Sequence, residues 1–192
     1  MSTTRSRVRA LSVAGLAVAV AAIGAVTYDA SAATTAPDAR SVAIPAIPTI
    51  IKPPAGSRPV GAFVVTKGTQ NYTCVVADGT TTGAYTGASV PEAQLIGTGG
   101  RIHHFAGPSW QSLRDGSLVT AVKDQSSPRA GTIPELLLKV NSHTGKGILS
   151  KADWINRLYT SGGVAPAGSC TAGQTVQVPY GAVYVFWDDP AI

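Results

Sequence analysis

The 192-residue chain is short of the side chains that catalytic and metal sites usually need. It has three histidines and two cysteines, and charged residues make up 13% of it. Gly-x-Ser-x-Gly, the nucleophile turn of α/β-hydrolases, does not occur. Gly-x-Gly-x-x-Gly is also absent, although "IGTGGR" (96–101) is rich in glycine. The sequence therefore predicts no dinucleotide cofactor and no serine hydrolase of this class.

Neither a metal ion nor a nucleic acid is an expected partner. Zinc needs three or four converging ligands, whereas His143 lies in a polar turn far along the chain from His103 and His104. Lys and Arg outnumber Asp and Glu by 15 to 10, but no basic run is interleaved with aromatic residues. A modest positive charge of this kind is more typical of a soluble surface than of a binding site.

Long apolar segments are missing too, except near the N-terminus. Three arginines within residues 5–9 precede an uncharged apolar run over 10–26, and Ala30-Ser31-Ala32 has the small side chains that signal peptidase requires. We expect residues 1–32 to be a signal peptide and the mature protein to be secreted, beginning at Ala33. The apolar run is slightly longer than usual, so an uncleaved amino-terminal anchor is the alternative. No membrane association is expected after cleavage.

Two cysteines, Cys74 and Cys170, remain in the part predicted to be exported. In an oxidising compartment an isolated pair is expected to form a disulfide. Closing a loop of roughly 100 residues would stabilise the fold by about 4.7 kcal/mol in the chain-entropy model. The alternative is a pair of free buried thiols. A metal site is disfavoured because neither cysteine has another cysteine or a histidine at ligand spacing.

The remaining chain divides into a proline-rich linker, residues 33–58, and a β domain, residues 59–192. Prolines at 45, 48, 53, 54 and 59 disfavour a helix and favour extended backbone. The isoleucines within residues 42–54 are too apolar for a free tether, however. We expect residues 42–54 to lie along the domain surface as an extended strap.

From residue 60 onward the sequence is typical of β structure. Short runs rich in Val, Thr and aromatic residues, such as "VGAFVV", "RIHHF" and "AVYVFW", are separated by glycine-rich turns. They predict a mainly β, single-domain fold, an antiparallel β-sandwich or barrel with one or two short helices. The helices are expected at "PEAQLI" (91–96) and "IPELLLKV" (133–140), because proline favours the first helical turn. Residues 151–160 fit either a helix or a strand.

Residues 101–110, "RIHHFAGPSW", hold the most distinctive side chains. If they begin as a strand, His103 and His104 point to opposite faces, so one ring should face inward. The pattern does not decide which. A histidine in this setting is either a hydrogen-bonded structural group or part of a site. Gly107-Pro108 then breaks the strand, which allows the following residues to turn back over its end.

We expect His104, Trp110 and Arg157 to line one polar-aromatic cleft, with Tyr72 and Tyr180 as weaker candidates. Trp would supply stacking area, and His and Arg would supply oriented donors for a polar extracellular ligand. Carbohydrate or cell-envelope material is the expected ligand. The alternative function is a small extracellular hydrolase that uses His104 with a carboxylate. The alternative structural interpretation makes Trp110 a core residue and Arg157 a solvated strand charge.

Several stretches together resemble the family called domain of unknown function 3455. They are "GTQNYTC" (68–74), "PEAQL" (91–95), "HFAGPSW" (104–110), "DGS" (115–117), "IPELLL" (133–138), "GKGILS" (145–150), "TSGGVAP" (160–166) and "VPYGAVYVFW" (178–187). The resemblance spans most of residues 45–187 and implies a secreted bacterial or fungal protein. It supplies no catalytic residues. Some fungal members carry a malate dehydrogenase label, which the missing dinucleotide motif does not support.

Two positions depart from the family pattern. Glu135 stands where the pattern has tryptophan after Ile-Pro, and Asn156-Arg157 stands where it has Gln-Arg. The second change keeps an amide beside the arginine. The first replaces an aromatic ring by a charge, which weakens any claim that this position lines a shared apolar pocket.

Overall fold

A computed structural model describes residues 42–86 and 88–192. The predicted signal peptide and residues 33–41 of the predicted linker lie outside the described residues. In the described part of the chain, no helix has the length and apolarity needed to span a membrane.

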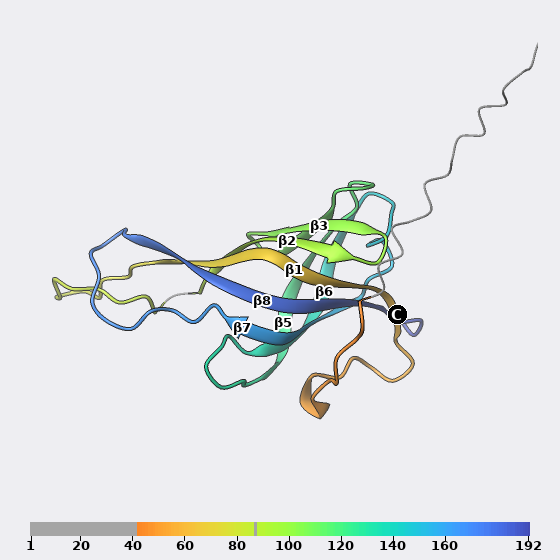
Figure 1. Cartoon of the computed structure of the whole chain (residues 1–192), viewed down its shortest axis with the longest axis horizontal. Helices are drawn as coiled ribbons and strands as arrows, with labels where there is room; N and C mark the ends of the chain where they lie inside the picture. The colour runs from red at the N-terminus through yellow and green to blue at the C-terminus, as the bar shows by residue number, and fades with distance from the viewer. Residues whose placement is uncertain (1–41, 87) are drawn as a thin grey trace, which may run out of the picture. The chain divides into compact units, whose positions relative to one another are not determined.

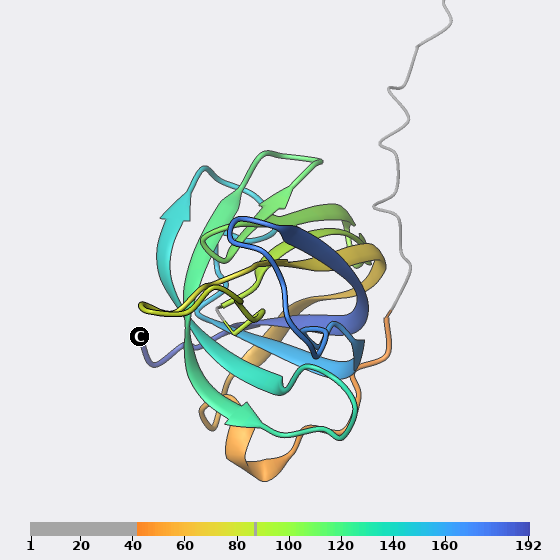
Figure 2. The same ribbon diagram turned by 90° about the vertical axis from the view of Figure 1, so that its left-hand side faces the viewer.

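The described residues form a closed antiparallel barrel of eight strands, each paired with the strands before and after it in sequence (Figure 1). The strands are β1 (Arg58–Thr73), β2 (Val90–Gly97), β3 (Gly100–Phe105), β4 (Ser109–Ser112), β5 (Leu118–Ser127), β6 (Glu135–Thr144), β7 (Trp154–Gly162) and β8 (Thr175–Asp188). Pairing of β8 with β1 closes the barrel, and Figure 2 shows the strands curving around its interior. The predicted mainly β, antiparallel fold is confirmed, as a barrel.

The two segments expected to begin helices are strands instead. Residues 91–96 lie in β2, where Ala93 and Leu95 face the interior and the residues between them face solvent, a strand period of two. Residues 135–138 begin β6 and are buried on both faces. The three leucines of this segment therefore form a continuous apolar run without the alternation that would have indicated a strand. The ambiguous residues 154–160 lie in β7. In the described residues the helical element is one 3-10 turn, η1 (Thr49–Ile51).

The interior of the barrel is a core of aliphatic and aromatic side chains. On β8, alternate residues Tyr180, Ala182, Tyr184 and Phe186 face inward. The Phe186 ring meets that of Phe63 on β1 edge to face, with ring centres 5.6 Å apart. Phe186 also meets Trp110 on β4, across the barrel, with ring centres 6.3 Å apart, so aromatic rings fill the interior.

A second apolar cluster lies between the barrel and residues 42–57, which run along its outer face. Ile51 is fully buried there against Leu137, Leu158 and Val185. Asn156 on β7 donates through Nδ2 to the Ile51 carbonyl at 2.8 Å, which ties η1 to the sheet. This covering segment, coloured orange in Figures 1 and 2, is why outward-facing residues of β6, β7 and β8 are apolar.

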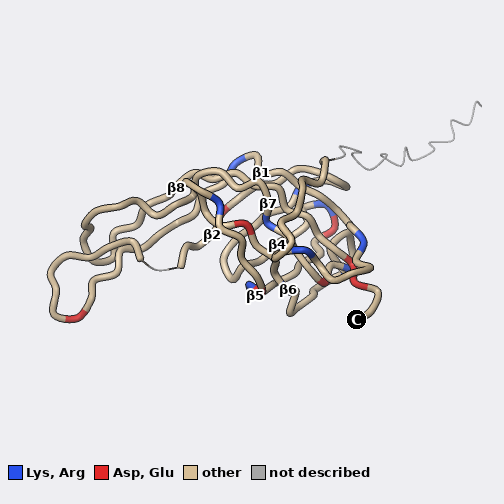
Figure 3. Tube along the Cα trace, turned by 90° about the horizontal axis from the view of Figure 1, so that it is seen from below, with Lys and Arg blue, Asp and Glu red and all other residues tan. Residues whose placement is uncertain are grey.

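The long strands β1 and β8 lead into two neighbouring loops, residues 74–89 and 163–174 (Figure 1). A disulfide joins Cys74 to Cys170 across these loops, as predicted, with Cα atoms 6.0 Å apart. Isolated β-bridges pair Val75 with Ala84 and Gly83 with Cys170. In these loops Asp78 is the sole charged residue, and Figure 3 shows charge concentrated on the barrel instead.

Candidate functional site

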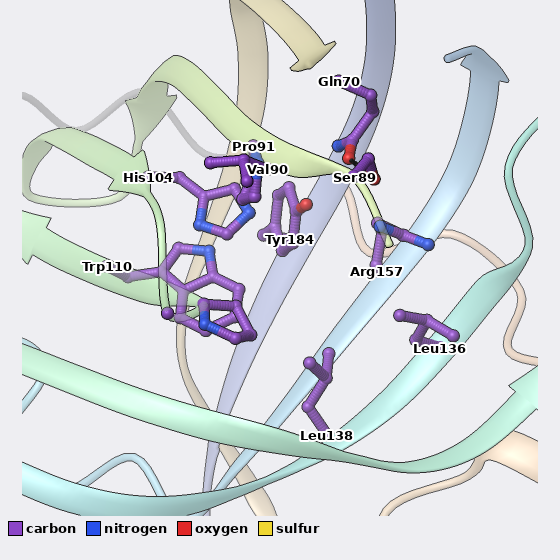
Figure 4. A pocket seen from close by; sticks show the side chains of 12 residues that line it. Gln70, Ser89, Val90, Pro91, His104, Trp110, Leu136, Leu138, Arg157 and Tyr184 are labelled. Atoms are coloured by element: carbon purple, nitrogen blue, oxygen red, sulfur yellow. Dashed lines mark hydrogen bonds between the residues drawn. The ribbon is translucent and has the colours of Figure 1, made fainter. Parts of the chain in front are cut away.

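A pocket of about 160 Å³ lies at the end of the barrel from which β1 and β8 extend. Its lining comes from the end of β1, the start of β2, the β3–β4 hairpin, and from β6, β7 and β8. Figure 4 shows His104 and Trp110 on one side, Gln70, Ser89 and Arg157 on the other, and Tyr184 between them. Three of the predicted site residues, His104, Trp110 and Arg157, therefore line one pocket.

The β3–β4 hairpin brings His104 and Trp110 together. They are directly opposite each other across the two strands, so both side chains point into the barrel. Gly107 makes the connecting turn with φ of +98°, a conformation that glycine adopts without strain. The two rings stack with centres 4.3 Å apart and planes 6° from parallel.

Trp110 is consequently both a core residue and a pocket residue. Its side chain is only 1% exposed and one ring face lies against His104, so it is not the open stacking platform expected from the sequence. The polar part of the Trp110 ring is its indole N–H. The indole Nε1–H is buried and has no hydrogen-bond partner in the described residues.

His104 is the inward-facing histidine of the pair. Its Nδ1 lies 2.8 Å from the Ser109 carbonyl, which can only accept, so Nδ1 carries the proton and Nε2 has a free lone pair. Burial lowers the pKa of His104 to about 3, and the positive charge of Arg157 adds to this effect; the Ser109 hydrogen bond opposes it. The ring is therefore neutral at ordinary pH. His103 faces outward and meets Glu92 at 2.7 Å.

Arg157 occupies the inner face of β7, opposite Leu136 on β6 and Tyr184 on β8. Its Nε and Nη2 atoms donate to the Pro134 carbonyl at 3.2 and 2.9 Å, which fixes one edge of the guanidinium. No carboxylate pairs with it among the described residues. Burial raises the pKa of the Tyr184 hydroxyl, and the nearby Arg157 charge offsets part of that rise. The guanidinium is thus a cation that the fold leaves without a counter-charge.

Gln70 on β1 supplies a second buried donor. The side chain is 2% exposed, and its Oε1 accepts a hydrogen bond from the Ser89 hydroxyl. Its Nε2 has no partner at hydrogen-bond distance in the described residues. Burial raises the pKa of the neighbouring Tyr180 hydroxyl, and the Gln70 amide offsets a small part of that rise. Native folds rarely leave buried polar atoms unpaired. In the described residues four side-chain atoms are in this state, and two of them, Gln70 Nε2 and Trp110 Nε1, belong to residues that line this pocket.

The weaker candidates, Tyr72 and Tyr180, do not line the pocket. Tyr72 is buried near the disulfide-linked loops and donates its hydroxyl to the Gly163 carbonyl at 2.6 Å. Tyr180 is also buried, on the inward face of β8, with its hydroxyl 3.3 Å from that of Tyr184.

Sequence reasoning missed Gln70, Ser89 and Tyr184. Strand periodicity could have found Tyr184, because it is four residues from Tyr180 and so shares its inward face. Gln70 likewise shares a strand face with Tyr72. Ser89 lies in a loop and enters the pocket only through the fold of residues 74–89.

The pocket lacks the groups that the hydrolase alternative requires. That alternative paired His104 with a carboxylate, but Nδ1 is bonded to a backbone carbonyl and no described Asp or Glu lines the pocket. Glu135, the departure from the family pattern, lies outside it and accepts from the Tyr159 N–H at 2.6 Å. Among the described residues, no three His, Cys, Asp or Glu side chains group as a metal site.

Comparison with known proteins places the chain by sequence. No curated protein matches it, and no solved structure does. A family described as "Protein of unknown function (DUF3455)" matches residues 92–188, which hold the β3–β4 hairpin, Arg157 and Tyr184. This match spans half of the chain and includes most of the pocket lining. The chain belongs to the DUF3455 family.

Proposed function

We propose that the protein is a secreted binding module for carbohydrate or cell-envelope material, and that the barrel-end pocket holds one polar group of the ligand. Secretion is supported by the leader pattern of residues 1–32 and by a disulfide, which is typical of oxidising compartments. Binding is supported above all by the two buried, unpaired donors, Trp110 Nε1 and Gln70 Nε2, that border one pocket.

A bound ligand would stabilise the protein by pairing with its unpaired buried donors. A buried donor without a partner costs about 1–3 kcal/mol, so the free protein carries a penalty that a ligand oxygen would remove. The pocket also offers an acceptor, His104 Nε2, and a charged donor, Arg157. Hydroxyl groups, which both accept and donate, are the common polar groups of carbohydrates, and they match this mixed set.

Binding is favoured over hydrolysis because of the basicity of His104. A general base works best when its pKa is near the working pH, whereas burial holds the pKa of His104 at about 3. A neutral imidazole is a good hydrogen-bond acceptor without being a strong base. The same burial that weakens His104 as a catalyst thus suits it to hold a hydroxyl.

The test is binding of the exported protein to an array of polysaccharides, oligosaccharides and peptidoglycan fragments, with hits measured by calorimetry. Trp110→Phe keeps a ring but removes the Nε1–H. It should weaken binding about threefold to tenfold, the worth of one hydrogen bond. The matched control is Trp154→Phe, on the outer face of β7, which should bind as the parent does. Equal affinity of parent and Trp110→Phe would refute this site.

A further inference from the structure

We infer that the pocket recognises a hexuronic acid at the end of a saccharide chain, its carboxylate held by Arg157 and the unpaired donors and a neighbouring hydroxyl held by His104. This inference rests on the proposed binding function and narrows its ligand class.

Most of the pocket's polar groups that could still form a hydrogen bond with a ligand are donors. Trp110 Nε1 and Gln70 Nε2 are both buried and unpaired. Arg157 is the single charged side chain among the described lining residues, and two of its nitrogens already share the Pro134 carbonyl. Three donor groups, one of them cationic, complement an anionic group with more than one oxygen. A carboxylate has this form and makes strong, charge-assisted hydrogen bonds with guanidinium.

The acceptor side of the pocket limits which carboxylate fits. His104 Nε2 has a lone pair and no partner in the described residues, and Nδ1 is committed to the Ser109 carbonyl. A ligand must therefore also donate a hydrogen bond on the His104 side (Figure 4). In a hexuronic acid the carboxylate is attached to C5 of the ring and the adjacent C4 bears a hydroxyl, so one residue supplies both groups. A simple peptide carboxylate has no such hydroxyl.

The size of the pocket indicates recognition of a chain end. Its volume of about 160 Å³ is close to that of a protein cavity that takes up one benzene ring, about 150 Å³. Because a hexuronic acid is larger than benzene, a pocket of this size would take the carboxylate-bearing part of one sugar residue, whereas an oligosaccharide could not enter. Trp110, Leu138 and Tyr184, all buried, close the pocket toward the barrel interior. A saccharide would therefore enter by one terminal residue, with the rest of the chain outside.

Two monosaccharide probes separate this inference from the proposed function. Methyl β-D-glucuronide and methyl β-D-glucoside differ only at C6, which is a carboxylate in the glucuronide and a hydroxymethyl group in the glucoside. ¹⁵N-labelled exported protein is titrated with each, and the three Trp indole N–H signals are followed by NMR. We expect the glucuronide to bind at least about tenfold more tightly, since charge-assisted bonds are roughly twice as strong as neutral ones. The Trp110 signal, assigned with Trp110→Phe, should shift most.

The decisive variant is Arg157→Gln, which keeps donors but removes the charge. Its preference for the glucuronide should fall to near one. Arg101→Gln, on the outer face of β3, changes the net charge equally and should keep the preference. Folding of both variants is checked by their amide spectra.

Every other result contradicts either the acidic-sugar inference or the proposed binding function. Equal binding of both probes refutes the acidic-sugar inference and leaves the binding function standing. Binding of neither refutes the inference; if the array also shows no ligand, the proposed function fails with it. N-acetyl-alanyl-alanine or lactate bound as tightly as the glucuronide would mean that the pocket recognises carboxylates without recognising sugar.

Discussion

Acidification from about pH 7 to pH 5 should destabilise this protein through its buried, neutral His104. In the folded state burial holds the pKa of His104 at about 3, against 6.5 for an ordinary histidine. Below about pH 6.5 the unfolded chain therefore binds a proton that the folded protein does not, so the free energy of unfolding falls as pH falls. Above that pH His104 contributes no pH dependence. Below about pH 3 both states are protonated and the slope vanishes.

The expected size follows from this difference in pKa. Each pH unit between the two pKa values costs about 1.4 kcal/mol. Between about pH 7 and pH 5 the loss from His104 is therefore about 2 kcal/mol, since its effect begins only near pH 6.5. That is a large share of the roughly 5–15 kcal/mol that stabilises a typical domain.

The assay is urea unfolding at several pH values for the parent and for His104→Asn. Asparagine can still donate to the Ser109 carbonyl but does not titrate. Its stability at neutral pH will be lower because it leaves a cavity, yet its loss on acidification should be smaller than the parent's by about 2 kcal/mol. Equal slopes in the parent and His104→Asn would refute a buried, neutral histidine.

Two further changes test the scaffold. Asn156→Ala removes a buried amide with three hydrogen bonds and should lower the unfolding free energy by at least about 3 kcal/mol. The exposed Asn141→Ala serves as its control in the same urea unfolding measurement, and similar losses would contradict the role of Asn156. Replacing Cys74 and Cys170 together by serine should cost about 4–5 kcal/mol on the chain-entropy model. Reductant should then destabilise the parent alone, and no effect on the parent would contradict a stabilising disulfide.

The β fold could be predicted from local patterns, but the covering of the barrel could not. Alternating runs and glycine-rich turns indicated strands correctly along most of the domain. The error at residues 135–138 arose because Leu137 packs against the segment that holds Ile51 while Leu136 and Leu138 face the interior. A strand buried on both faces loses its period of two. Only the tertiary position of residues 42–57 explains that pattern.

Within the candidate site, the sequence could predict only the pairing of His104 with Trp110, because a single turn brings these two residues together. The Gly107-Pro108 break after His104 indicated that Trp110 would return beside it, and the two rings do stack. The position of Arg157 depends instead on the register of β6, β7 and β8, which no local pattern determines. Gln70 reaches the pocket from a strand more than thirty residues before His104. Such long-range pairings are set by barrel closure as a whole.

Two buried amides differ in how completely the described residues satisfy their hydrogen bonds. Asn156 uses both Nδ2 hydrogens and Oδ1, in bonds to two carbonyls and to the Trp187 indole. Gln70 is nearly as deeply buried, but in the described part of the chain only its Oε1 has a hydrogen-bond partner, and its side chain lines the pocket. An amide needed only for stability would be satisfied as Asn156 is, or replaced by an apolar side chain at little cost. The free amide nitrogen of Gln70 therefore fits the proposed ligand oxygen in the pocket.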